Sequence, residues 1–251
     1  MGNEVIEMKI GIIGAGNIGA TLARKLAACG HEVKLANSKS PQSLQNLANE
    51  IGVRAVTKEQ AVSEVDVVIL SIPFASYPDL KQTLSNLPEK TVIIDTSNYY
   101  PGRDGAIKEV DDGMPESVWV SEKIGHPVVK AWNAVLAATL ADKGQPDGSP
   151  TRIALPVAGG NLKAETVAQS LVEDTGFIAL AAGDLEDSWR QQPGTPAYCT
   201  ELTLPQLKLA LQVADKERAP QNREALMARF MAPGSQFTHE QIVATNRAMT
   251  A

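Results

Sequence analysis

Three glycines near the start of the chain, Gly14, Gly16 and Gly19, stand in the pattern G-x-G-x-x-G. They follow a short apolar run and open a stretch with helical spacing, which predicts a turn from a strand into a helix. In such a turn the first glycine permits the bend, the second lets a pyrophosphate approach the backbone, and the third lets the helix pack closely on the sheet. Unpaired N–H groups at the helix N-terminus then attract the anion. The motif, with Asn17 and Ile18 inside it, predicts dinucleotide binding.

The residues that follow the second predicted strand, 31–36, indicate which dinucleotide binds. An acidic residue there would hydrogen-bond the ribose 2′-hydroxyl and repel a 2′-phosphate. This chain has Asn37, Ser38 and Lys39 instead, and their amide, hydroxyl and ammonium groups suit a phosphate. We therefore expect NADP rather than NAD. The segment can also begin a helix, since Ser40 is a good N-cap residue.

The composition is typical of a globular protein. A chain of 251 residues with 43% hydrophobic content can bury one large core or two modest ones. The net charge of −6, without a Lys/Arg cluster, argues against nucleic acid as a partner. No apolar run approaches the roughly 20 residues that span a bilayer, and segment 1–7 is acidic where a signal peptide would be basic. We therefore expect a cytoplasmic protein with no membrane partner.

Two cysteines, Cys29 and Cys199, are too few and too far apart for a metal cluster or a C-x-x-C redox pair. We expect both to be small buried side chains, and we expect no metal site. His31, His126 and His239 also lack metal-binding spacing, so structural or exposed roles are expected for them.

Strands and helices alternate along the chain, which predicts an α/β protein with a doubly wound parallel sheet of the Rossmann type over residues 1–140. The strand patterns cover 9–13, 31–36, 53–56, 65–71, 91–95 and 128–132, with helical patterns at 18–29, 43–50 and 77–87 and a polar loop at 96–112. A turn-rich joint at 143–150 introduces a smaller C-terminal α/β domain, residues 141–251, which completes the substrate cleft. Its predicted strands cover 152–158 and 177–181, its helices cover 162–173, 202–214 and 223–230, and segment 234–251 is expected to be loosely attached.

In a doubly wound sheet, ligands lie across the carboxyl ends of the strands. At one such end, Ser71, Ile72 and Pro73 can form a flat wall against the nicotinamide and its ribose, although Pro73 can equally serve only to end the strand. Asn98 and Asn133 offer amides at the next two strand ends, where asparagine is also a routine turn residue.

A fourth candidate is the loop 191–198, whose polar side chains and two prolines can form the lip of a substrate pocket or simply connect two elements. Its Tyr198 is the attractive candidate for a proton donor. Asn133 and Tyr198 are therefore the two candidate catalytic residues.

With these residues in place, the chain resembles the NADP oxidoreductase family that includes the deazaflavin coenzyme F-420:NADP oxidoreductases. The resemblance covers residues 9 to about 200 and depends on segments 14–19, 37–39, 71–73, 95–100, 129–133, 156–159 and 192–197. It implies NADP binding by the glycine turn and by Ser38 and Lys39, with Ile72 and Pro73 beside the nicotinamide.

Two other comparisons concern the second substrate. Archaeal deazaflavin reductases typically have His-Thr-Ile-Pro where this chain has Asn-Ala-Val-Leu at 133–136. The Lys-Ala-Trp-Asn pattern at 130–133 is also similar to the cytosolic domain of six-helix membrane ferric reductases, which pass electrons from NADPH through flavin.

Three functions fit the sequence. The first is an NADP-dependent reductase that exchanges a hydride with coenzyme F-420 or a flavin as co-substrate, with Asn133 and the loop 192–198 touching that acceptor; such a reaction mainly needs orientation. The second is reduction of a small C=N or C=O substrate, as in pyrroline-carboxylate or imine reductases, with Tyr198 as proton donor. The third is a non-catalytic NADP(H) sensor. A homodimer is expected, because a small second domain often completes its core across a two-fold axis.

Overall fold

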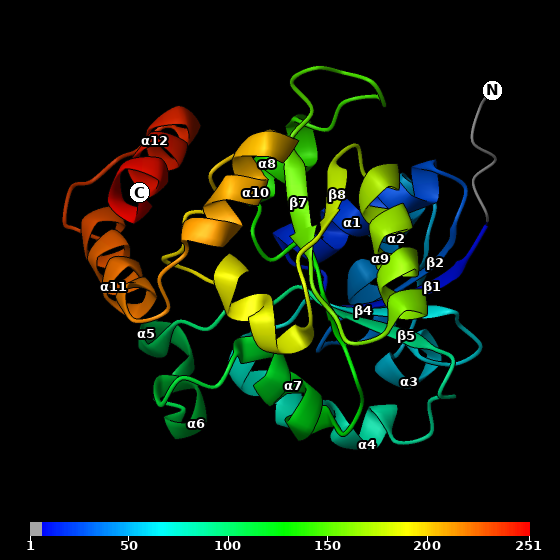
Figure 1. Ribbon diagram of the computed structural model, residues 1–251. Coiled ribbons are helices and arrows are strands. Elements are labelled where there is room, and N and C mark those ends of the chain that lie inside the picture. Colours follow the sequence, from blue (N-terminus) through cyan, green and yellow to red (C-terminus); the bar gives the residue numbers. More distant parts are fainter. Residues whose placement is uncertain (1–6) are drawn as a thin grey trace.

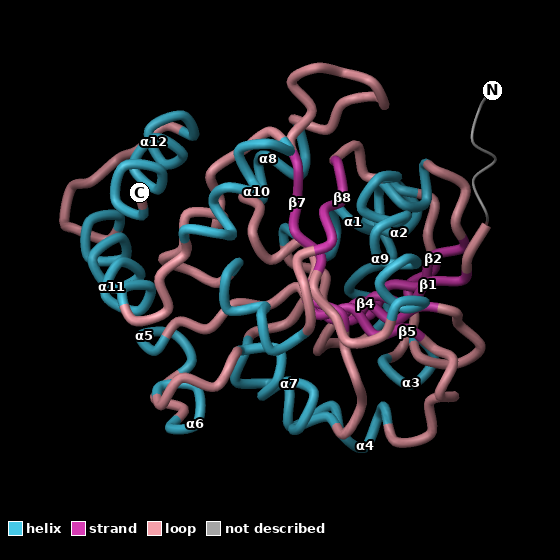
Figure 2. Tube along the Cα trace, viewed as in Figure 1, coloured by secondary structure: helices cyan, strands magenta, loops and turns pink. Residues whose placement is uncertain are grey.

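A six-stranded parallel sheet forms the centre of the molecule (Figures 1 and 2). The computed structural model describes residues 7–251, so the expectation drawn from segment 1–7 falls almost wholly outside them. The strand order is β3-β2-β1-β4-β5-β6, and every neighbouring pair is parallel. The strands are β1 (Lys9–Ile13), β2 (Glu32–Ala36), β3 (Arg54–Ala55), β4 (Val67–Leu70), β5 (Val92–Asp95) and β6 (Val129–Lys130). The order reverses between β1 and β4, as in a Rossmann fold, and this confirms the predicted fold class.

The central strands are apolar apart from Lys9 at the start of β1 and Asp95 at the end of β5, because both of their faces are buried. Ile12 of β1 and Ile69 of β4 enter one core, and Ile13 and Leu70 enter the other. The first core is covered by α1 (Asn17–Ala28), η1 (Pro41–Leu44), α2 (Gln45–Ile51), α8 (Ala137–Asp142) and α9 (Leu162–Asp174). The second is covered by α3 (Lys58–Ala61), η2 (Phe74–Leu80), α4 (Lys81–Leu84), α6 (Lys108–Asp111) and α7 (Glu116–Ile124).

A second, two-stranded parallel sheet is formed by β7 (Ala154–Val157) and β8 (Ile178–Ala181), with α9 connecting them. An antiparallel bridge between Lys130 and Ala158 joins β7 to the end of β6. Leu155 and Val157 share a core with Ile12 of the large sheet. The two predicted domains, 1–140 and 141–251, therefore share one core.

The sequence patterns missed or misplaced several elements on the second face of the sheet. The predicted loop 96–112 contains two single-turn helices, α5 (Pro101–Asp104) and α6, and α7 was not predicted. The apolar stripe of α7 is interrupted because Glu116 and Ser117 are buried along with Trp119. The helix expected at 77–87 is a 3-10 segment followed by one α-turn, since Pro78 removes a backbone donor.

The C-terminal third is helical after η3 (Leu185–Gln191), with α10 (Leu204–Val213), α11 (Arg218–Phe230) and α12 (His239–Thr250). α11 and α12 lie side by side at the end of the molecule far from β2 (Figure 1). The expectation that segment 234–251 is loosely attached is wrong. Val243 is buried in α12, Asn246 Nδ2 donates to Cys199 O at 3.0 Å, and Arg247 Nε donates to Thr200 O at 2.6 Å.

None of the helices in the described part of the chain has the length and apolar character needed to cross a membrane. Within residues 7–251, no cluster of three or more His, Cys, Asp or Glu side chains is placed to hold a metal ion. Cys199 is buried as expected, whereas Cys29 is only half-buried and its Sγ donates to Asp174 O at 3.2 Å. His31 is buried against Asp174, with Nε2 and Oδ2 3.1 Å apart, so it has the expected structural role.

Candidate functional site

The glycine turn lies where the strand order reverses, between the carboxyl ends of β1 and β4. Gly14 has a φ of +111°, and a Cβ there would lie 1.9 Å from Ser71 O. A Cβ on Gly19 would lie 1.9 Å from Gly14 O. Both positions therefore require glycine for close packing, and Gly14 requires it for its backbone conformation as well.

Gly16 differs from its two neighbours in the motif. A Cβ built there would meet nothing within 4 Å, so this residue faces open space. It is the N-cap of the 12-residue helix α1, has no side chain to cap that helix, and is followed by no acidic residue in the first turn. The first-turn N–H groups are therefore available to an anion, and the space over Gly16 fits the pyrophosphate of a dinucleotide. Asn17, beside it, is exposed, and Ile18 is partly buried.

The turn after β2 is ordered by Asn37, whose Oδ1 accepts from Lys39 N at 2.9 Å and whose Nδ2 donates to Ser43 Oγ at 3.1 Å. Ser38 and Lys39 are exposed. Lys39 makes no ion pair with any residue that the structure describes. Ser40 is the N-cap of η1, as the alternative interpretation expected, without a side-chain capping bond. Both interpretations are compatible, because Asn37 shapes the turn and leaves the next two side chains for a phosphate.

Ser71, Ile72 and Pro73 lie at the end of β4 against the glycine turn. Ser71 N donates to Ile13 O at 2.8 Å. Ile72 is close as well, since its Cγ2 lies 3.3 Å from the position of a Cβ on Gly14. Pro73 is exposed and precedes η2. The three residues therefore form one wall of the crevice that the glycine turn opens.

Asn133 connects the ends of β5 and β6 to the loop that begins at Gln191. Its Nδ2 donates to Asn98 Oδ1 at 3.0 Å and to Gln191 O at 2.8 Å, and its Oδ1 accepts from Gln191 Nε2 at 2.8 Å. Asn98 Nδ2 donates back to Asn133 O at 2.9 Å. Asn133 is only 2% exposed, and its amide positions the loop; contact with an acceptor stays a prediction.

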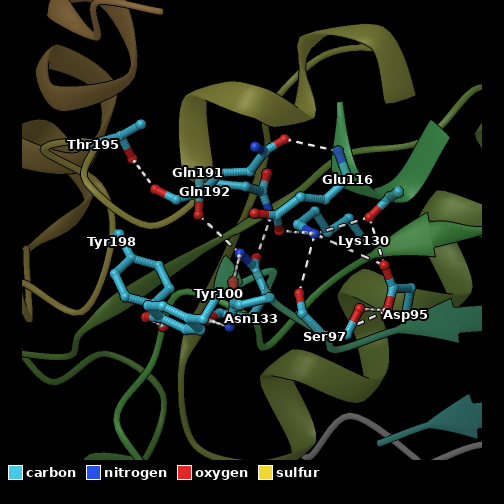
Figure 3. Close-up of polar contacts among 12 residues, drawn as sticks. Asp95, Ser97, Tyr100, Glu116, Lys130, Asn133, Gln191, Gln192, Thr195 and Tyr198 are labelled. Carbon is cyan, nitrogen blue, oxygen red and sulfur yellow. Dashed lines mark hydrogen bonds and ion pairs between the residues drawn. The ribbon is translucent and has the colours of Figure 1, made fainter. Parts of the chain in front are cut away.

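Tyr198 pairs with Tyr100, which follows β5, with the two hydroxyl oxygens 2.8 Å apart (Figure 3). Burial raises the pKa of both phenols, that of Tyr198 well above its ordinary value. Both hydroxyls therefore carry their protons at neutral pH. One of them can donate a hydrogen bond to a ligand while it accepts a hydrogen bond from the other. The sequence missed this pair because 98 residues separate its members.

A fully buried lysine lies under the same strand ends (Figure 3). Lys130 Nζ lies 3.3 Å from Glu116 Oε2, 3.8 Å from Asp95 Oδ2, and 2.9 Å from Ser117 Oγ. Burial raises the pKa of Glu116 despite the opposing charge of Lys130. Glu116 N also donates to Gln192 Oε1 at 3.0 Å, so this charged cluster anchors the loop 191–198 from below.

Residues in left-handed backbone conformations adjoin both candidate catalytic residues. Trp132, before Asn133, has a φ of +55°, and Cys199, after Tyr198, also has a φ of +55°. Such conformations cost on the order of 1–3 kcal/mol for a residue other than glycine and persist where the surrounding structure fixes them. Cys199 is fixed by its N–H, which donates to Ala134 O at 3.0 Å.

The tyrosine pair lines a cavity of about 270 Å³ between the strand ends and the C-terminal helices. Its apolar wall consists of Leu136, Leu226, Met227, Phe230 and Ile242. The glycine turn and this cavity are the two features of the site that can hold small molecules, one a nucleotide and the other an apolar group.

A Rossmann sheet with an open glycine turn is typical of proteins that bind dinucleotides. The model of the family described as "NADP oxidoreductase coenzyme F420-dependent" matches residues 9–99. Protein YjhV of Escherichia coli (strain K12) is 38% identical over 104 residues, which are 41% of this chain and 76% of YjhV. The chain belongs to this family of NADP-dependent oxidoreductases.

Two solved structures resemble most of the fold. The hypothetical protein SMa0349 from Sinorhizobium meliloti is 32% identical with a TM-score of 0.67, over 77% of this chain and 94% of that one. A protein of Arthrobacter sp. FB24, provisionally named an F420-dependent NADP-reductase, is 21% identical with a TM-score of 0.58, over 71% of this chain and 86% of that one. The second likeness shows the fold alone.

Proposed function

We propose that the protein is an NADP(H)-dependent oxidoreductase that exchanges a hydride with a deazaflavin or flavin co-substrate at the carboxyl ends of β4, β5 and β6. The observation that carries this proposal is the open space over Gly16 at the uncapped start of α1. The family description supports a deazaflavin as the acceptor class. When bound, NADPH supplies the hydride.

Each part of the chain has a defined role in this proposal. The N–H groups after Gly16 bind the pyrophosphate, and Ser38 and Lys39 bind the 2′-phosphate. Ile72 and Pro73 hold the nicotinamide against the sheet edge. The loop 191–198, fixed by Asn133 and the Lys130 cluster, excludes water on the opposite side.

The test is NADPH oxidation by the purified protein, followed by loss of NADPH absorbance with coenzyme F-420, FMN or FAD supplied separately. Rapid turnover with F-420 supports the deazaflavin acceptor, and turnover with the flavins alone moves the acceptor to flavin. Tight NADPH binding without oxidation by any acceptor would contradict the proposal and favour a sensor.

A second candidate is reduction of a small C=O or C=N substrate, which the Tyr100–Tyr198 pair favours. A carbonyl or imine needs a proton as well as a hydride, and a hydroxyl pair beside an apolar cavity can deliver one. The same assay with small ketones and imines tests it. Oxidation of NADPH by these compounds, lost in Tyr198→Phe, identifies this function.

We also propose that the protein works as a cytoplasmic homodimer. Light scattering of the purified chain gives its mass in solution and tests the dimer directly; a monomeric mass contradicts it.

A further inference from the structure

The cavity beside the tyrosine pair has one cation in a wall that is otherwise apolar or neutral. Arg223 of α11 stands between this cavity and a second hollow beside Met114 and Trp189, lines both, and has a side chain that is only 12% exposed. Its Nε pairs with Glu224 Oε1 at 2.9 Å, but the Glu224 side chain is 59% exposed and compensates little of the charge. Nη1 and Nη2 of Arg223 make no hydrogen bond with any residue in the range 7–251.

The orientation of Arg223 is fixed by its surroundings. Its guanidinium lies over the Tyr99 ring, 5.3 Å from the ring centre, and Tyr99 is fully buried. No acidic side chain is among the described residues that line the cavity. Among the described residues, neither Nη1 nor Nη2 of Arg223 is a fully buried polar atom without a partner, so each can be reached by water or by a ligand, and a guanidinium pairs best with a carboxylate.

The other polar groups of the cavity are hydroxyls and one amide. Tyr100 and Tyr198 present their hydroxyls, and Asn246 uses its Nδ2 to bind Cys199 O. The remaining side chains of the wall are apolar. The volume of about 270 Å³ is just below the roughly 300–1,000 Å³ of sites for drug-sized ligands, which favours a ligand of few carbon atoms.

We propose that this cavity binds a small monocarboxylate with an apolar chain. The carboxylate accepts hydrogen bonds from Nη1 and Nη2 of Arg223, the pairing that guanidinium groups form best. The hydrocarbon chain of the ligand lies against Leu226 and Met227. Such an acid, carrying a C=O or C=N group near Tyr198, is the substrate class of the reductase; this last step rests on the second candidate function above, whereas the binding does not.

The experiment is calorimetric titration of the full chain, saturated with NADP⁺, with hexanoate. Two probes separate the contribution of the carboxylate from that of the hydrocarbon chain, because 1-hexanol has the hydrocarbon chain without the charge and acetate has the charge without the hydrocarbon chain. Hexanoate is expected to bind saturably and at least about tenfold more tightly than either probe, since a hydrogen-bonded charge pair and the buried chain each contribute about that factor.

Variants on α11 locate the binding. Arg223→Gln is expected to weaken hexanoate binding about tenfold or more, because it removes the charge. Met227→Trp is expected to abolish this binding, because the larger side chain fills the apolar part of the cavity. Arg229→Gln is the matched control, because Arg229 is exposed on the same helix and does not line the cavity. NADPH binding by each variant, measured by fluorescence, reports whether it is folded.

Absence of saturable hexanoate binding, or equal affinity in the wild type and in both cavity variants, would overturn the proposal. If the protein binds hexanoate but oxidises NADPH with none of the acceptors tested, the cavity site stands and the reductase function is contradicted. If the protein turns over coenzyme F-420 but does not bind hexanoate, the reductase function stands and the cavity site is contradicted.

Discussion

Gly14 and Gly16 belong to one motif, yet alanine is expected to affect mainly stability at the first position and mainly NADPH binding at the second. At Gly14 the backbone has a φ of +111° and the new Cβ would lie 1.9 Å from Ser71 O. Left-handed strain costs about 1–3 kcal/mol and overpacking about as much again, so Gly14→Ala is expected to lower the free energy of unfolding by roughly 2–6 kcal/mol.

At Gly16 the backbone has a φ of −75° and the new Cβ meets no atom within 4 Å. Alanine is a poorer N-cap than glycine, so Gly16→Ala is expected to cost only about 0.5–1 kcal/mol of stability. The methyl group occupies the space that we assign to the pyrophosphate. NADPH affinity is therefore expected to fall at least about tenfold, which is about 1.4 kcal/mol of binding free energy.

Urea unfolding and NADPH fluorescence titration of both variants measure these two quantities separately. Wild-type NADPH affinity in Gly16→Ala would refute the placement of the pyrophosphate. Wild-type stability in Gly14→Ala would refute the packing argument at the β1–β4 crevice.

Four further outcomes are expected. Lys39→Asp should reverse the preference for NADPH over NADH in paired titrations, and an unchanged preference would contradict the 2′-phosphate assignment. Tyr198→Phe should abolish turnover of small carbonyls and imines while leaving NADPH affinity unchanged, as stopped-flow and equilibrium titrations can show. Lys130→Met leaves two buried carboxylates without their cation and should lower the free energy of unfolding by about 3–5 kcal/mol in urea. Burial raises the pKa of Glu201, but hydrogen bonds from Thr139, His239 and Lys143 outweigh burial and hold this pKa below its ordinary value. Glu201 Oε1 lies 2.6 Å from His239 Nε2 at the start of α12; the stability that this contact adds to α12 is therefore complete above the ordinary pKa of glutamate and lost as the pH falls through the lowered one, which hydrogen exchange of α12 amides measures.

The cofactor half of the site could be predicted from sequence because its signals are local. Strand β1, the glycine turn and α1 form one contiguous segment, and Ser71 and Pro73 follow an apolar run that is typical of a buried parallel strand. Because the carboxyl ends of adjacent parallel strands lie at the same edge of a sheet, β1 and β4 bring these two segments together.

The acceptor half depends on pairs that are distant in sequence. Nothing near Tyr100 indicates that Tyr198 will meet it, and nothing near Lys130 indicates that Glu116 will. The helix that carries Glu116 was missed for the same physical reason, because a buried polar residue that satisfies a distant partner interrupts the apolar stripe by which a helix is recognised. Asn133 was placed correctly at a strand end, but its partner Gln191, 58 residues later, determines what the amide does.

The order of these segments along the chain has a consequence for synthesis. A ribosome completes the glycine turn and the wall at Ser71 long before it reaches Tyr198, and the tie between Asn133 and Gln191 cannot form until most of the chain has emerged. The segments to which we assign the nucleotide are thus synthesised before the opposite wall of the site. A fragment truncated after α9 keeps the glycine turn and the wall at Ser71, to which we assign the dinucleotide, and lacks the C-terminal helices that line the cavity.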